Sequence, residues 1–271
     1  MHFAASHPFL DHDGPLPIVH RGGALEAREN TLSAFELAVS AGFRYIETDV
    51  RVTADGVLVA FHDATLGRVT DRDGRIAELP WSEVTQARIG GREPIPRLSE
   101  LLEAFPDVRF NLDAKEDATL RPLARLLRRP GLLDRVCLAS FSDRRLRWLR
   151  TAMGPGACTA LGPAEIFRLK RAAQTGRGSP LPWLAPTALA AQVPVGPALL
   201  PLVDGRFVRA AHANGLAVHA WTIDDEADMD RLLDLGVDGI MTDRPGRLKA
   251  VLVRRAQWPG SPPAQGLSAR R

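Results

Sequence analysis

Strand-like and helix-like patterns alternate along the chain from residue 17 to residue 255, and this alternation is the strongest constraint on its fold. Short runs rich in Val, Ile, Leu and Phe predict strands, and apolar residues three or four apart predict helices. Regular alternation is typical of βα units around a parallel sheet. We expect strands at 17–21, 45–50, 57–62, 109–115, 135–141, 157–161, 188–194, 217–223 and 239–243. We expect helices at 31–41, 98–105, 118–129, 143–152, 164–172, 203–214, 225–235 and 246–255.

Nine strands are one too many for a closed eight-stranded barrel, and the sequence Asp55-Gly56 resolves the excess. An Asp-Gly pair between two apolar runs is a strong hairpin signal, so 57–62 should return antiparallel beside 45–53. Eight parallel strands then remain. We therefore predict an α/β protein, a (β/α)8 TIM barrel with a hairpin-bearing insertion after the second barrel strand. The hairpin also brings His62 back beside Thr48, at the same end of the barrel.

The barrel domain is expected to span 17–256, after an N-terminal extension at 1–16. The glycine-containing stretch 64–96 is interpreted as an insertion over the active-site mouth. The stretch 257–271, which contains prolines and two terminal arginines, is predicted to be a disordered basic tail. Cys137 and Cys158 lie in apolar runs, so we expect two reduced core residues.

Composition excludes several classes of protein. The hydrophobic share of 45% and the charged share of 25% are ordinary for a globular domain. No run approaches the ~20 apolar residues of a membrane span, and Met1–Pro17 has no secretory pattern, so we expect a cytoplasmic enzyme without membrane insertion. Removing the six basic residues of 247–271 from the net charge of +3 leaves −3 over residues 1–246. We expect no nucleic-acid partner, because no aromatic residues interleave a basic stripe.

Carboxylates gather at two of the predicted strand ends. Glu47 and Asp49 are two residues apart, so both face one side of their strand, and Asp113 has the same spacing from Asn111 on the next barrel strand. Two buried carboxylates repel each other unless a cation or a proton lies between them. Three carboxylates suit one divalent cation, Mg²⁺ or Ca²⁺, and the sequence does not separate the two ions. The alternative is a structural salt bridge to a nearby arginine.

Two cationic side chains belong to the same strand ends. Lys115 lies two residues beyond Asp113 and faces the same side, where a phosphate oxygen would be a natural partner; the alternative is a pair with Asp113 itself. Arg21 ends the first strand and is followed by Gly22 and Gly23, which would let the backbone approach a ligand closely. A guanidinium group binds phosphate oxygens through two parallel hydrogen bonds.

Histidines complete the candidate site. His20 and His62 are predicted at the same mouth as the carboxylates, where they suit acid and base catalysis near neutral pH. Trp221 ends an apolar strand and is expected either to form a wall for the substrate or to pack in the core. Gln192 faces the same end but is a weaker candidate, and 242–245 has no assigned role.

These residues closely resemble the glycerophosphodiester phosphodiesterase family over about residues 17–250. The N-terminal motifs are His20-Arg21-Gly22, Glu29-Asn30-Thr31, Glu47-Thr48-Asp49-Val50, Thr53-x-Asp55-Gly56 and His62-Asp63-x-Thr65-Leu66-x-Arg68-x-Thr70. The later motifs are Asn111-x-Asp113-x-Lys115, Ala220-Trp221-Thr222, Gly236-Val237-Asp238-Gly239-Ile240 and Thr242-Asp243-Arg244-Pro245. The chain departs from the family pattern at Asp113, where glutamate is usual, and at Arg28, where proline is usual.

The resemblance implies a function and assigns roles to residues. It implies metal-dependent hydrolysis of glycerophosphodiesters to sn-glycerol 3-phosphate and an alcohol such as choline, ethanolamine, inositol or glycerol. Its metal ligands correspond to Glu47, Asp49 and Asp113, its catalytic histidines to His20 and His62, and its phosphate-binding groups to Arg21 and Lys115. One histidine would take a proton from the glycerol 2-hydroxyl or from water, and the other would protonate the departing alkoxide. The family favours the intramolecular hydroxyl, which gives a cyclic phosphate.

Rival functions remain open from the sequence. A phospholipase-D-like enzyme acting on lysophospholipids or sphingomyelin would need an apolar groove, and the apolar residues of 64–96 are scattered among polar ones. A non-catalytic phosphodiester-binding barrel predicts a missing histidine or metal ligand, and none is missing. A barrel glycosidase would use paired carboxylates but gives no reason for two histidines with Arg21 and Lys115. Head-group preference and oligomeric state are not encoded in any motif that we identified.

Overall fold

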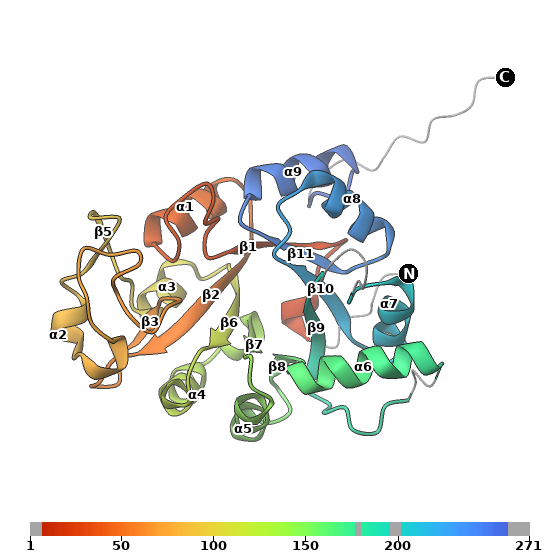
Figure 1. Cartoon of the computed structure of the whole chain (residues 1–271), viewed down its shortest axis with the longest axis horizontal. Coiled ribbons are helices and arrows are strands. Elements are labelled where there is room, and N and C mark those ends of the chain that lie inside the picture. The colour runs from red at the N-terminus through yellow and green to blue at the C-terminus, as the bar shows by residue number, and fades with distance from the viewer. Residues whose placement is uncertain (1–6, 177–179, 196–201, 260–271) are drawn as a thin grey trace.

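The computed structural model describes residues 7–176, 180–195 and 202–259. Eight parallel strands form a closed barrel in the order β1-β11-β10-β9-β8-β7-β6-β2, and pairing of β1 with β2 closes it (Figure 1). The barrel strands are β1 (Leu16–His20), β2 (Tyr45–Val52), β6 (Arg109–Ala114), β7 (Val136–Ala139), β8 (Cys158–Ala160), β9 (Ala188–Pro194), β10 (Ala217–Trp221) and β11 (Gly239–Thr242). The predicted TIM barrel is confirmed.

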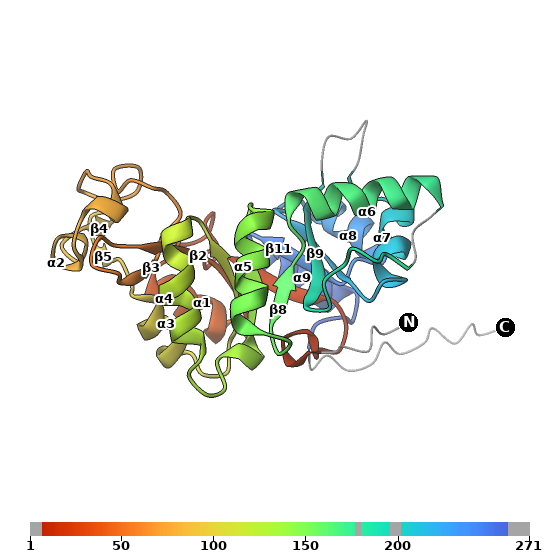
Figure 2. The same cartoon turned by 90° about the horizontal axis from the view of Figure 1, so that it is seen from below.

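Helices connect the strands and cover the outside of the barrel (Figures 1 and 2). They are α1 (Leu32–Ser40), α3 (Leu98–Ala104), α4 (Leu120–Leu127), α5 (Asp143–Met153), α6 (Pro163–Thr175), α7 (Gly205–His212), α8 (Glu226–Asp234) and α9 (Pro245–Arg254). Side-chain caps fix several of the helix starts, as where the Thr31 hydroxyl accepts from the Ala34 amide. Every predicted strand and helix is present, with ends displaced by three residues or fewer.

The predicted hairpin is also confirmed. Strand β3 (Leu58–Ala60) runs antiparallel to the upper part of β2, with Val50 opposite Ala60. Strand β1 pairs only with the lower part of β2, where His20 lies level with Glu47. The hairpin therefore occupies the edge of β2 that β1 leaves free, and the chain returns to the barrel mouth immediately before His62.

The insertion 64–96 forms a small packed unit beside the mouth. It contains α2 (Trp81–Val84) and the short strands β4 (Arg88–Ile89) and β5 (Glu93–Pro94). Its buried side chains form a separate apolar cluster with Val59 and Phe61 of the hairpin. Figures 1 and 2 show the unit at one end of the molecule, outside β3 and α3. None of the described residues of 64–96 lines the mouth cavity, and the apolar side chains of this stretch pack against the hairpin.

The N-terminal extension closes the opposite end of the barrel. A single 3-10 turn, η1 (Pro8–Leu10), buries Phe9 and Leu10, and the Tyr45 hydroxyl donates to the Phe9 carbonyl over 3.0 Å. These side chains share the lower barrel interior with Cys137 and Cys158. Both cysteines are buried and free, as predicted.

The folded domain extends slightly beyond the predicted boundary at 256. The Trp258 amide donates to the Leu252 carbonyl over 3.1 Å, and its ring packs edge-on against Phe43 with centroids 4.9 Å apart. Residues 257–259 of the predicted tail therefore pack against the barrel domain through Trp258, and residues 260–271 lie outside the described residues. No described helix is long and apolar enough to cross a membrane.

Candidate active site

All of the sequence-predicted site residues line one cavity of about 540 Å³ at the C-terminal ends of the barrel strands. They are His20, Arg21, Glu47, Asp49, His62, Asp113, Lys115 and Trp221. They come from four barrel strands and the hairpin. Active sites of βα-barrels lie at this end of the barrel and are built from several strands in the same way. The fold therefore brings all eight predicted residues to one cavity.

The loop after β1 is shaped by packing, which corrects our interpretation of its glycines. Gly22 has a φ of +84°, and an added Cβ would lie 2.7 Å from the Ala34 Cβ. Gly23 has a φ of +91°, and an added Cβ would lie 2.9 Å from the Pro245 ring. The glycines are thus required by close approach to helices α1 and α9, and they leave the Arg21 side chain directed into the cavity.

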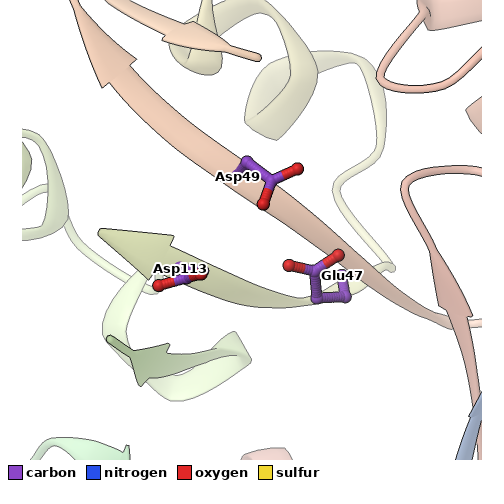
Figure 3. Close-up of side chains that lie close together, drawn as sticks. All are labelled: Glu47, Asp49 and Asp113. Carbon is purple, nitrogen blue, oxygen red and sulfur yellow. The ribbon is translucent and has the colours of Figure 1, made fainter. Parts of the chain in front are cut away.

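Glu47, Asp49 and Asp113 form a buried acidic cluster (Figure 3). Asp49 and Asp113 are register partners on the neighbouring strands β2 and β6, and Glu47 lies one pleat below Asp49. One carboxylate oxygen from each residue lies within 4.8 Å of the other two. Such an arrangement gathers three anionic oxygen donors around one point, where a hard cation fits.

Permanent cations already pair with part of this cluster. Lys115 Nζ lies 2.7 Å from Asp49 Oδ1 and 2.6 Å from Asp113 Oδ2, and Arg21 Nε lies 2.9 Å from Asp49 Oδ2. Burial alone would raise the pKa of Asp49, but Lys115 and Arg21 outweigh it and lower that pKa. Burial would lower the pKa of Lys115, but Asp49 and Asp113 raise it. The salt-bridge alternatives are therefore realised alongside the cluster.

Three oxygens of the cluster have no hydrogen-bond partner among the described residues. They are Glu47 Oε2, Asp113 Oδ1 and Asp49 Oδ1, and all three are buried, although Lys115 forms an ion pair with Asp49 Oδ1. Burial, reinforced by the Asp49 charge, raises the pKa of Glu47 to about 8. An unpaired buried carboxylate oxygen is costly, so the cluster contains oxygen atoms that its protein partners leave unsatisfied.

His20 is held between two carboxylates. Its Nδ1 lies 2.7 Å from Asp243 Oδ1 and its Nε2 lies 3.6 Å from Glu47 Oε2. Burial disfavours the imidazolium form, but Glu47 and Asp243 outweigh burial and raise the pKa of His20. Asp243 follows β11, next to β1 in the closed barrel. The sequence analysis assigned Asp243 no role, because its partner lies 223 residues away in the chain.

His62 is oriented by a second carboxylate. Its Nδ1 lies 2.6 Å from Asp63 Oδ1, and the Arg51 guanidinium donates to the His62 carbonyl over 2.8 Å. Arg68 pairs with Asp63 and also with Glu29, whose carboxylate lies 3.6 Å from Arg21 Nη1. This chain of ion pairs connects the loops that carry the two histidines. The motif residues Asp63 and Arg68 were the available signal for this network.

A polar layer lies level with Glu47, one pleat below Asp49 and Asp113. Asn111 and Gln192 exchange two hydrogen bonds of 3.1 Å across the barrel, and Gln192 Nε2 lies 3.4 Å from His219 Nδ1. His219 is fully buried, and its Nε2 has no hydrogen-bond partner among the described residues. Burial lowers the pKa of His219 to about 4, against the opposing effect of Asp238. His219 is therefore a neutral structural residue at pH 7.

His219 should make the fold acid-sensitive. The unfolded chain binds a proton with a pKa near 6.5, so stability from neutral His219 is complete above pH 6.5 and is lost as pH falls toward 4. Between pH 7.5 and pH 5 this loss amounts to about 2 kcal/mol. Urea unfolding of the wild type and His219→Gln at both pH values checks it: the variant should lose about 2 kcal/mol less. An equal loss in both proteins would assign the acid sensitivity to other groups.

Aromatic side chains border the cationic end of the cavity. Trp221 lines the cavity and packs edge-on against Phe141, with ring centroids 5.6 Å apart. Lys115 Nζ lies 5.6 Å from the centroid of the Phe141 ring. Trp221 thus both lines the cavity and packs against another side chain. Phe141 was missed, because its short loop after β7 carries no polar motif.

A (β/α)8 barrel that gathers carboxylates, histidines and cationic side chains at the C-terminal ends of its strands has the architecture of an enzyme. The model of the glycerophosphoryl diester phosphodiesterase family matches residues 20–247. The chain belongs to this family and is a phosphoric diester hydrolase, as the sequence motifs implied.

Individual relatives agree with this assignment. The Mycobacterium tuberculosis protein named "Probable glycerophosphodiester phosphodiesterase 2" is 36% identical over 93% of this chain and 96% of its own length. A Caldanaerobacter subterraneus glycerophosphodiester phosphodiesterase is 30% identical over 86% of this chain and 96% of its own. An Oleispira antarctica phosphodiesterase, solved in complex with the product sn-glycerol-3-phosphate, superposes with a TM-score of 0.72 at 27% identity, covering 88% of this chain and 97% of that one.

Proposed function

We propose that this site hydrolyses glycerophosphodiesters to sn-glycerol 3-phosphate and an alcohol, with one divalent cation and two histidines. The observation that carries the proposal is the buried acidic cluster with His20, His62, Arg21 and Lys115 around one cavity. The product bound to the Oleispira antarctica relative supports the choice of substrate. A non-catalytic binding barrel has less support, because every candidate ligand and histidine lines the cavity.

Glu47, Asp49 and Asp113 would hold the cation. Their oxygen donors suit Mg²⁺ or Ca²⁺, and the unpartnered Glu47 Oε2 and Asp113 Oδ1 are the atoms that such an ion would satisfy. Asp113 is shorter than the glutamate usual in the family, but its place directly level with Asp49 keeps its oxygens within the cluster. When bound, the ion supplies positive charge that stabilises a phosphoryl group as it gains negative charge.

Arg21 and Lys115 are placed to bind the phosphate group. Both reach the cavity from strand ends, and both lie within 3 Å of Asp49, so they flank the metal cluster. A guanidinium group holds two phosphate oxygens in a fixed geometry, and the lysine adds a point charge. Held there, these charges stabilise the phosphoryl oxygens without reorganisation during the reaction.

The two histidines would move the protons. One accepts the proton of the attacking hydroxyl, which we assign to the glycerol 2-hydroxyl because an internal nucleophile gains from proximity. The other donates a proton to the alkoxide that leaves. Water then opens the resulting cyclic phosphate to sn-glycerol 3-phosphate. The paired carboxylates Asp243 and Asp63 orient the two rings.

The decisive assay is release of sn-glycerol 3-phosphate from glycerophosphocholine and glycerophosphoethanolamine. We expect release with Mg²⁺ or Ca²⁺ and its loss on chelation, because the unpaired carboxylate oxygens need a cation. Restoring each ion separately after chelation identifies which one supports turnover. Undiminished release in excess chelator would contradict the metal assignment, and no release from either diester would contradict the substrate class.

A further inference from the structure

The mouth cavity has a polar half and an apolar half. The polar half comes from β1, β2, β6 and the hairpin, and it carries the groups described above. Among the described residues, the other half comes from the segment after β8, from α6, from the end of β9 and from Leu202. Its lining residues are apolar: Leu161, Pro163, Ile166, Phe167, Pro194 and Leu202. The phosphoryl chemistry needs only the polar half, so the apolar half requires a separate explanation.

The apolar half combines a rigid wall with exposed aromatic residues. Leu161 and Ile166 are 4% and 8% exposed and belong to the core, so the wall is fixed. Phe167 is 62% exposed and Phe141, at the border with the polar half, is 64% exposed. Large apolar side chains that are this exposed and line one cavity are typical of ligand-binding surfaces.

The distribution of charge indicates what this half can bind. Among the described residues that line the cavity, the carboxylates are Glu47, Asp49 and Asp113, all in the polar half. The aromatic pair Phe141–Trp221 could attract a quaternary ammonium group, but this pair lies at the border with the polar half, beside Lys115, and none of the described residues that line the apolar half carries a charge. An uncharged hydrocarbon group therefore matches this surface better than a cationic head group.

We propose that the apolar half binds a hydrocarbon chain carried by the phosphodiester, and that Phe167 and Phe141 determine specificity for it. The chain could belong to the glycerol side, as an acyl group, or to the departing alcohol, as an alkyl group. The inference rests on the proposed function, since the hydrocarbon chain must belong to a substrate whose phosphate is bound by Arg21 and Lys115. The sequence analysis sought such a surface in 64–96, whereas the described residues that form it belong to α6, to the loop before α5 and to positions 194 and 202.

A binding experiment tests the apolar half without requiring turnover. Hexyl phosphate and ethyl phosphate share the phosphate group and differ by four methylenes, each worth roughly fourfold in affinity when buried. Calorimetry with Mg²⁺ and with Ca²⁺ should give a dissociation constant for hexyl phosphate at least ~10-fold below that for ethyl phosphate. Dissociation constants within twofold of each other would overturn the proposal.

Phe167→Gln tests the residue assignment. Phe167 is exposed, so the substitution should leave the fold intact, and the affinity ratio of the two phosphates should fall by at least ~3-fold. The matched control is Leu37→Gln, because Leu37 is 63% exposed but lies on α1 outside the cavity lining. The ratio should not change in this control. A ratio that Phe167→Gln also leaves unchanged would overturn the assignment.

Turnover then shows which part of the substrate carries the hydrocarbon chain. It also distinguishes failure of this inference from failure of the proposed function. The substrates are glycerophosphocholine, 1-hexanoyl-lysophosphatidylcholine and sn-glycero-3-phosphohexanol. A higher kcat/KM for the acylated diester assigns the chain to glycerol, and a higher value for the hexanol diester assigns it to the alcohol. If glycerophosphocholine is hydrolysed and both chain-bearing diesters are poorer substrates, this inference fails alone. If hexyl phosphate binds selectively but no diester is cleaved, the proposed function fails alone.

Discussion

His20→Ala should lower kcat for glycerophosphodiester hydrolysis by ~10²-fold or more, because a positioned acid or base contributes at least that much. His20 is the more buried of the two histidines; its Nδ1 is hydrogen-bonded to Asp243, and Glu47 Oε2 lies 3.6 Å from its Nε2. KM should change less than kcat, because Arg21 and Lys115 still bind the phosphate. The measurement is steady-state release of sn-glycerol 3-phosphate with saturating metal.

Two further variants make this result specific. Asp243→Asn keeps the size of the side chain but weakens the preference for the tautomer in which His20 Nδ1 donates to residue 243, so kcat should fall with little change in KM. His12→Ala is the control, because His12 contacts Tyr45 at the opposite end of the barrel and should retain full activity. Near-wild-type kcat in His20→Ala would remove His20 from the mechanism.

Local sequence predicted most of the fold and the polar half of the site. Strand and helix periodicities are properties of consecutive residues, so each barrel element could be identified. The Asp55-Gly56 turn specified the hairpin and thereby the position of His62 beside the carboxylates. Glu47 and Asp49 could be assigned to one face because side chains in a strand alternate with a period of two.

The missed features depend on contacts between distant segments. Asp243 reaches His20 only because β11 and β1 become neighbours when the barrel closes. The apolar half of the cavity depends on which side of α6 faces the mouth, and Phe167 carries no motif that would indicate this. The location of 64–96 follows from its packing against Val59 and Phe61. The alternation of side chains along a strand shows which residues share a face, but it does not show which segment of the chain packs on that face.

Asp49→Asn should have the largest effect of all, with kcat/KM lower by ~10³-fold, because metal ions supply several kcal/mol of transition-state stabilisation. Asp49 is the centre of the cluster: it pairs with Arg21 and Lys115 and accepts a hydrogen bond of 3.0 Å from Asn30. Asparagine keeps the shape but loses the charge that holds both the cation and the two phosphate-binding side chains. Calorimetric titration with Mg²⁺ and Ca²⁺ checks the metal affinity directly, independently of turnover.

Loss of the Asp49 charge should therefore lower two measured quantities, the affinity for the metal ion and kcat/KM. The control is Asp107→Asn, which removes an exposed carboxylate just before β6 and should change neither quantity. If Asp49→Asn bound the ion with wild-type affinity but lost activity, Asp49 would act only as an anchor for Arg21 and Lys115. In that case Glu47 and Asp113 alone would hold the cation, and Glu47→Gln should then abolish the binding that Asp49→Asn preserved.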